Sequence, residues 1–219
     1  MKNQINWFDH VFNVFSVIIG VSLAFYVNDS AETNRREKEF NAIIDSFLEE
    51  LAADRATYAE YQIPDNKSQA EAISDVLELI EAGSSDSLEY KFSRAIGINN
   101  YFPSGVTFKS LQSAGKLDLI EDFELRKVLS TYHTILAEEA RVRGQIQVDF
   151  YMDQLMPWLV KNTDFKNPDA RSLRGSELSN LLMLYQSFVL NKVANYEEMV
   201  LQIDYLHKQL SKLKENKAE

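Results

Sequence analysis

The sequence predicts an all-α protein in which an N-terminal transmembrane helix continues into a long helix, followed by an antiparallel helical bundle. Three observations predict this fold class. Residues 11–27 read VFNVFSVIIGVSLAFYV, a run without a charged side chain. Farther along, apolar residues recur at intervals of three and four, which is the period of a helix with one buried face. Only 7 glycines and 4 prolines occur in 219 residues, which favours long helices over sheet.

Residues 7–27 have the length of one membrane crossing. As a helix they would span roughly 31 Å, and the hydrocarbon core of a bilayer is about 30 Å thick. Trp7 and Tyr26 lie near the two ends, where aromatic side chains favour the headgroup region. We therefore expect residues 1–29 to be a membrane anchor. Two alternatives stay open, because Ser22-Leu23-Ala24 resembles a signal-peptide cleavage site and a buried helix of a soluble protein would accommodate the polar residues.

The basic residues near the anchor predict its orientation. Arg35, Arg36 and Lys38 follow the apolar run, whereas Lys2 precedes it. Because basic residues are retained on the cytoplasmic side, the C-terminal body is expected in the cytoplasm and the short N-terminus outside.

A stripe of small residues in the anchor predicts self-association. Ser16, Gly20 and Ala24 recur at intervals of four, and Asn13 lies on the same side of the helix. Small side chains let two membrane helices approach closely, and an amide can form a hydrogen bond between them. The plainer reading is that such residues are common in membrane helices.

The rest of the chain predicts one helical domain over residues 30–211, with a polar tail at 212–219. Its partners are expected to be the lipid bilayer and either further copies or another protein. The formal net charge of -10 argues against nucleic acid, because a phosphate backbone would be repelled.

The first helix of the body should follow the anchor without a break. We expect it to end before Pro64, because the residue preceding a proline is pushed out of helical geometry. A second helix should end at Gly83, which adopts the left-handed conformation without strain. The apolar positions of the first helix are Phe40, Ile44, Phe47, Leu51, Tyr58 and Tyr61.

Shorter elements are expected in the middle of the chain. Asp86 and Glu89 form a capping-box pattern for a helix over residues 88–96. Residues 99–105 should be a break, followed by a short helix closed by Gly115. Either Asp118 or Asp122 should cap the next helix.

Two long helices should complete the bundle. One runs to about Pro157, with Gly144 as a weak point. After a loop, Asn167 and Pro168 form a pattern of helix initiation, and the last helix begins near Ser176. Long helices with such apolar faces pack most simply antiparallel.

The sequence offers little that would support catalysis. The three histidines are far apart, no cysteine is present, and the common nucleotide-binding and nucleophile motifs are missing, so neither a metal nor a cofactor is expected. Arg126 and His133 on one helix face resemble the Arg-x4-6-His motif of the HEPN ribonucleases, in which the histidine would move a proton while the arginine holds phosphate. Lys127 departs from that motif, and the alternative is an ordinary, partly exposed helix face.

Two stretches resemble a family of uncharacterised bacterial single-pass inner-membrane proteins, a domain of unknown function. The first is Gly20-Val-Ser-Leu-Ala-Phe-Tyr-Val-Asn-Asp29 with the charged run that follows, and the second is Thr107-Phe-Lys-Ser-Leu-Gln-Ser-Ala-Gly-Lys-Leu-Asp-Leu-Ile120. The tryptophan that usually follows the anchor in that family is missing here. The resemblance implies an inner-membrane anchor and a helical body, and it implies no chemistry.

Two functional hypotheses follow. The first is a non-enzymatic, membrane-anchored protein that acts through self-association or partner binding. The second is an oligomeric pore or effector, with Asn13 and Ser16 facing a lumen and ribonuclease chemistry at Arg126 and His133.

Overall fold

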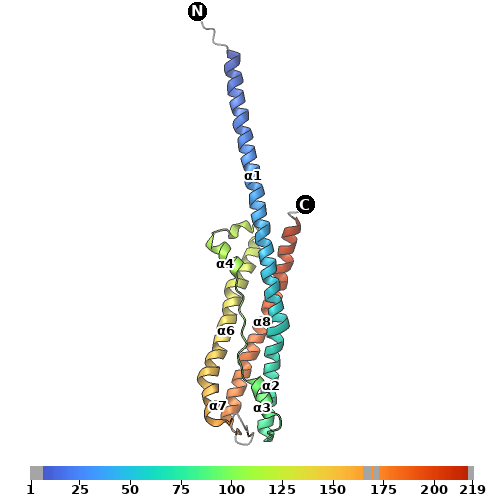
Figure 1. The fold of residues 1–219 in the computed structure, drawn as a ribbon, viewed down its shortest axis with the longest axis vertical. Helices are drawn as coiled ribbons and strands as arrows, with labels where there is room; N and C mark the ends of the chain where they lie inside the picture. The colour runs from blue at the N-terminus through green and yellow to red at the C-terminus, as the bar shows by residue number, and fades with distance from the viewer. Residues whose placement is uncertain (1–6, 165–168, 170–172, 217–219) are drawn as a thin grey trace, which may run out of the picture. The chain divides into compact units, whose positions relative to one another are not determined.

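A computed structural model describes residues 7–164, 169 and 173–216, and these residues form helices and no strand (Figure 1). The all-α prediction is therefore confirmed, and the N-terminal helix does continue into a long helix. The chain divides into two compact units, Met1–Asp45 and Ser46–Glu219, which are described separately below.

In the first unit, the apolar run belongs to helix α1 (Trp7–Ala56). Among the described residues, one helix is long and apolar enough to cross a membrane, and none of its most apolar window is buried in the protein. Phe12, Phe15, Leu23 and Phe25 are each more than 60% exposed. A run of large exposed apolar side chains is typical of a surface that meets a membrane or another protein.

The helix does not end before Pro64. A π-helical turn, η1 (Thr57–Gln62), joins α1 to α2 (Ile63–Ala82), and the N–H of Ile63 bonds the carbonyl of Tyr58, five residues back. In an α-helix, a proline removes one hydrogen bond and its ring collides with the carbonyl four residues earlier. The wider π-turn directly before the proline relieves that collision, so our predicted break was wrong.

The same solution recurs at Pro157. The turn η4 (Tyr151–Leu155) precedes α7 (Met156–Asn162), in which the proline lies in the first turn. Together with α5 (Phe123–Ser130), η3 (Thr131–Leu136) and α6 (Ala137–Phe150), these elements form one continuous helical region. Helix α8 (Ser176–Asn216) begins where predicted, but it continues through most of the predicted polar tail. The predicted cap at Asn167 and Pro168 lies outside the described residues.

The short elements agree with the predictions in part. Gly83 has a φ of 67° after α2, and the Asp122 side chain accepts a hydrogen bond of 3.1 Å from the N–H of Leu125, so both predicted helix ends are confirmed. Helix α4 (Val106–Ser113) and η2 (Leu117–Leu119) follow the predicted break. The capping box was wrong, because the residue that precedes α3 (Leu88–Ala95) is Ser87, with a φ of 57° and no side-chain cap.

Within the second unit, α8 packs against both α2 and α6 and supplies much of the core. Besides Val193 and Asn195, its buried residues follow alternating intervals of four and three, which is the pattern of helices packed knobs-into-holes. They are Leu178, Leu182, Tyr185, Val189, Lys192, Tyr196, Met199, Ile203, Leu206 and Leu210.

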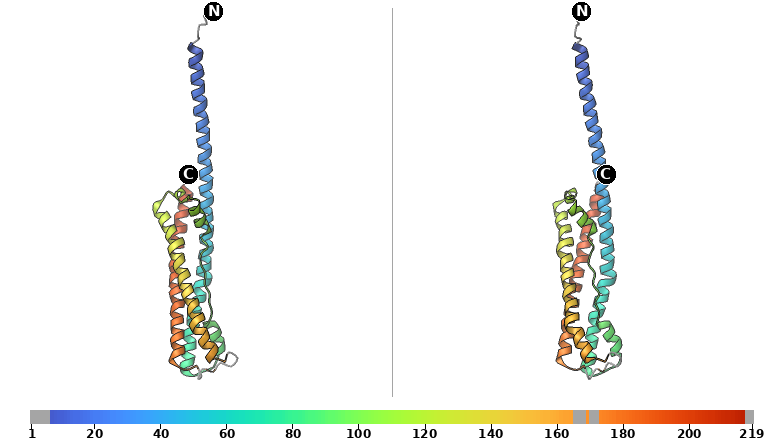
Figure 2. Two further views of the ribbon diagram at one scale, coloured as in Figure 1. Left: turned by 90° about the vertical axis from the view of Figure 1, so that its left-hand side faces the viewer. Right: turned by 60° about the vertical axis from the view of Figure 1, so that its left-hand side comes forward.

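Residues 96–105 connect α3 to α4 without regular secondary structure. This connecting segment runs lengthwise along the bundle, from α3 at one end to α4 towards the other (Figures 1 and 2). An extended chain forms no hydrogen bonds of its own, so its buried polar groups need partners on the surrounding helices.

Candidate functional site

The main chain of the connecting segment is bonded by side chains from the bundle. Gln69 Nε2 on α2 donates to the carbonyls of Ala95 and Gly97 at 3.1 and 2.9 Å. The hydroxyl of Tyr185 on α8 also donates to the Gly97 carbonyl. Farther along, the N–H of Tyr101 donates to the hydroxyl of Tyr196 at 3.1 Å. Side chains on two helices thus replace the neighbouring strand that an extended chain would have in a sheet.

Asn99 is the most extensively bonded residue of the segment. Its carbonyl accepts from Lys192 Nζ at 2.8 Å and from Asn66 Nδ2 at 3.4 Å. Its side-chain oxygen accepts from Gln62 Nε2 at 2.9 Å, and its amide nitrogen donates to Asp65 at 3.2 Å. The bundle therefore contacts both the main chain and the amide side chain at this position.

Lys192 occupies a core position of α8 and is fully buried. Its ammonium donates to three uncharged oxygens: the Asn99 carbonyl, Asn100 Oδ1 at 2.7 Å and Gln147 Oε1 at 2.6 Å. Burial lowers the pKa of Lys192 to about 7, because the charged form loses its hydration. The side chain thus lies close to the balance between charged and neutral forms at neutral pH.

A buried carboxylate lies on the α1 portion of the same unit. Asp54 is 2% exposed and accepts hydrogen bonds from the hydroxyls of Tyr101 at 2.7 Å and Tyr132 at 2.9 Å. Burial raises the pKa of Asp54, although both hydrogen bonds oppose the shift. The Tyr58 ring packs beside Tyr101 and Tyr196, with centroids 5.1 and 4.9 Å away.

Glu50 holds the far end of the connecting segment. Its carboxylate accepts from the Ser104 hydroxyl at 2.8 Å and from the N–H groups of Val106 and Thr107 at 2.8 and 3.2 Å. It therefore caps the N-terminus of α4 from another helix. Burial opposes ionisation, but these hydrogen bonds lower the pKa of Glu50 below its ordinary value.

The predicted weak point at Gly144 has a structural cause. A Cβ atom at this position would lie 3.0 Å from the Phe102 ring and 3.1 Å from Asn100 Nδ2. The amide of Asn100 also donates to the Gly144 carbonyl, at 3.4 Å. The glycine therefore allows the connecting segment to pass close to the backbone of α6.

The two residues of the ribonuclease prediction lie in different environments. Arg126 Nη1 donates to the carbonyl of Ile120 at 2.8 Å. His133 is 8% exposed and stacks on Phe108 at 5.0 Å, and neither ring nitrogen has a hydrogen-bond partner among the described residues. Burial lowers the pKa of His133 to about 4, so its imidazole is neutral at physiological pH. No described hydrogen bond or ion pair joins the two side chains.

The predicted contact face of the anchor lies on α1. Ser16, Gly20 and Ala24 are exposed, and a Cβ added at Gly20 would meet nothing within 4 Å. Asn13 belongs to the same helix, but its side chain lies outside the described part of the structure.

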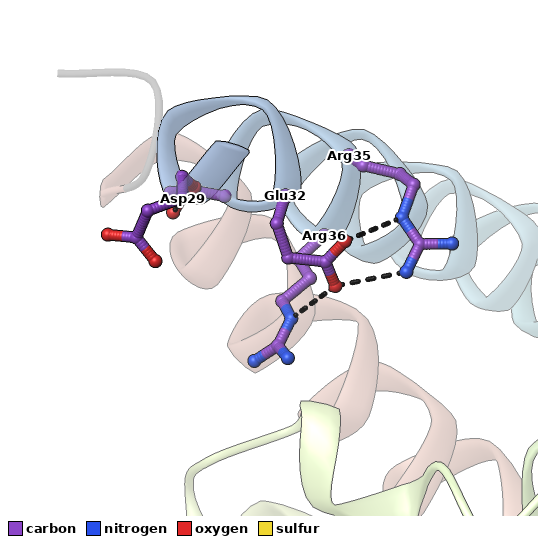
Figure 3. A network of polar contacts seen from close by, with 5 residues as sticks. Asp29, Glu32, Arg35 and Arg36 are labelled. Carbon is purple, nitrogen blue, oxygen red and sulfur yellow. Dashed lines mark hydrogen bonds and ion pairs between the residues drawn. The ribbon is translucent and has the colours of Figure 1, made fainter. Parts of the chain in front are cut away.

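A polar cluster follows the apolar run (Figure 3). Glu32 accepts hydrogen bonds of 3.0 Å from Arg35 and from Arg36, and these bonds lower the pKa of Glu32 to about 2. The cluster places two guanidinium groups about two helical turns beyond the apolar run, which ends at Val27.

Sequence reasoning missed Asp54 and Lys192, although a signal for both was present. Each lies at a core position of a pattern with alternating intervals of four and three: Asp54 between Leu51 and Tyr58, and Lys192 between Val189 and Tyr196. Charged residues are rarely buried unless they have polar partners. A charged residue at such a position therefore predicts a buried polar site.

Comparisons with protein-family models, with curated proteins and with solved structures gave no match. Function must therefore be inferred from the geometry. Within the described residues, no group of three His, Cys, Asp or Glu side chains is placed to hold a metal ion. What the arrangement does chemically is hold an extended segment of the same chain through hydrogen bonds.

Proposed function

We propose that this protein is a single-pass membrane protein whose helical body acts without catalysis, by assembling with further copies or with a partner protein. The observation that carries the proposal is the exposure of the apolar run in α1, where Phe25 is 71% exposed. Membership of the bacterial single-pass family named above is part of this proposal. The burial of His133 favours this function over a ribonuclease, because a stacked imidazole without access cannot move a proton at a phosphate.

The body is proposed to lie in the cytoplasm, at the inner membrane of a bacterium. Arg35 and Arg36 support this orientation because they lie close to the C-terminal end of the apolar run, after residues 28–34. Their pairing with Glu32 does not weaken the argument, since acidic residues contribute little to the positive-inside rule.

Alkaline extraction of membranes tests the anchor. The full chain is expected to stay in the pellet, and a variant lacking residues 7–29 is expected in the soluble fraction with its helical circular dichroism retained. Protease added to spheroplasts should leave the body intact, whereas protease added to inverted vesicles should digest it. Release of the full chain by alkali would contradict the anchor, and digestion in spheroplasts would reverse the orientation.

Substitution of Gly20 tests self-association through the anchor. Gly20→Leu is expected to reduce chemical crosslinking of the full chain in membranes several-fold, because a large side chain separates two closely packed helices. Ile19→Leu, at the neighbouring position, is the matched control and should crosslink like the native chain. Equal crosslinking of all three would contradict this contact face. Single-channel recording tests the pore hypothesis, because a pore predicts that the crosslinked oligomer conducts ions.

A further inference from the structure

The connecting segment is held by hydrogen bonds and by few apolar contacts, namely Ile96 at the edge of the core and the Tyr101 ring beside Tyr58. Pro103 and Gly105 are its two buried residues, whereas Ile98 and Phe102 are 41% and 40% exposed. Apolar burial is the main source of stability, and the net contribution of each hydrogen bond is modest. A segment attached in this way can open at a lower free-energy cost than the whole bundle.

The surface beneath the segment is a continuous polar stripe. Residues of η1 and α2 that recur at intervals of four or three line one side of it. Two residues of α8, four positions apart, line the other side. We call this surface the groove, and its lining residues are Tyr58, Gln62, Asn66, Gln69, Lys192 and Tyr196. In a helical bundle such positions are ordinarily apolar, so the stripe supplies hydrogen-bonding groups where apolar side chains are usual.

The groove offers more hydrogen-bonding groups than the segment uses. Tyr58 Oη, Gln62 Oε1 and Asn66 Oδ1 are buried without a hydrogen-bond partner among the described residues. The amide nitrogens of Gln62 and Asn66 bond Asn99, and the Tyr58 ring contacts Tyr101, so all three unpaired atoms belong to side chains that face the segment. Unpaired buried polar atoms are costly, and a ligand that paired them would be favoured over the present occupant.

We infer that residues 96–105 form a releasable strap, and that the groove beneath is a binding site for an extended peptide of a partner protein. The groove would bond the main chain of that peptide and an amide side chain at the place of Asn99, as it does for the strap. The inference deepens the partner-binding part of the proposed function, and it does not depend on insertion of the anchor.

Thiol labelling of the full chain in detergent micelles tests strap release. The chain has no cysteine, so a single introduced thiol reports on one position. Asn66 on α2 lies under the strap and Val76 lies on the same helix, and both are 0% exposed. If the strap opens separately, Asn66→Cys should be labelled by N-ethylmaleimide at least about tenfold faster than Val76→Cys. Equal rates would mean that the groove opens only when the bundle unfolds, which would overturn the inference.

A synthetic peptide with the sequence of residues 95–107 tests the binding site. It should slow the labelling of Asn66→Cys and leave that of Val76→Cys unchanged, whereas the same peptide with alanine at the places of Asn99 and Asn100 should protect several-fold less. Equal protection by both peptides, or by neither, would overturn specific recognition in the groove. Labelling that slows as the protein concentration rises would assign the groove to the strap of a second copy and overturn the assignment to another protein.

Circular dichroism of Asn66→Cys excludes misfolding as a cause of fast labelling. The substitution removes the 2.7 Å hydrogen bond to the Gln62 carbonyl and the long 3.4 Å bond to Asn99, but it keeps the 2.8 Å bond from Lys192 to Asn99. Native protein probed by limited proteolysis gives a second measurement. Cleavage should fall first within residues 96–105, and cleavage first within α8 would contradict strap release.

Discussion

The free energy of unfolding is expected to rise between pH 7 and about pH 9.5, by roughly 3 kcal/mol, and this rise should disappear in Lys192→Met. In the unfolded chain Lys192 holds its proton up to its ordinary pKa of 10.5, whereas in the folded protein its pKa is about 7. Between these values the unfolded state binds more protons, so stability increases with pH. Urea titrations of the full chain in detergent micelles, followed by circular dichroism, measure the slope.

Above pH 10 the trend should reverse. Burial raises the pKa of Tyr101 and of Tyr196 to about 12, so these side chains keep their protons in the folded protein after they have ionised in the unfolded chain. The folded state then binds more protons, and stability falls as pH rises.

Lys208→Met is the matched control for Lys192→Met, because Lys208 is an exposed lysine of the same helix. If the free energy of unfolding of Lys192→Met rises with pH as much as that of the native protein, the assignment of this rise to Lys192 is contradicted.

Asp54→Ala is expected to lower the free energy of unfolding by about 2–4 kcal/mol, because two tyrosine hydroxyls lose their acceptor. Tyr132 is fully buried and its hydroxyl donates to Asp54 at 2.9 Å, so no water replaces the lost bond there. Tyr132→Phe should cost about 1–2 kcal/mol, since Asp54 keeps the hydrogen bond from Tyr101. Urea titration of each variant measures these changes.

Tyr58→Phe is the matched control for the Asp54 series. Tyr58 is equally buried, but its hydroxyl has no hydrogen-bond partner among the described residues, so removing that hydroxyl should change stability by at most about 0.5 kcal/mol or increase it. The double variant Asp54→Ala/Tyr132→Phe should lose less than the sum of the single losses, because the two side chains share one bond. Additive losses, or a large loss in Tyr58→Phe, would contradict the role given to Asp54.

Much of the fold could be predicted because helical signals are local. The apolar run in α1, Gly83 after α2 and the Asp122 cap are each defined by a few neighbouring residues. The prolines at 64 and 157 were misjudged for the same reason. A local rule treats proline as a break, whereas the π-turns before them let tertiary packing keep each helix continuous.

The polar interior illustrates the limit of periodicity. Asp54 and Lys192 lie at core positions of the helical pattern, and that pattern alone favours apolar side chains there. Their partners come from residues far along the chain: Lys192 bonds Asn99, Asn100 and Gln147. Periodicity within one helix carries no information about which distant segment lies against it.

The sequence by itself determined the helical class, the single apolar run of membrane length and some of the helix ends, because each follows from intrinsic propensity or from the spacing of residues within a few turns. Only the tertiary structure decided that residues 96–105 lie along the bundle and that buried side chains bond their main chain. The physical reason is that an extended segment has no hydrogen-bonding pattern of its own. Its partners are fixed by how the helices pack, and that packing is a property of the whole bundle.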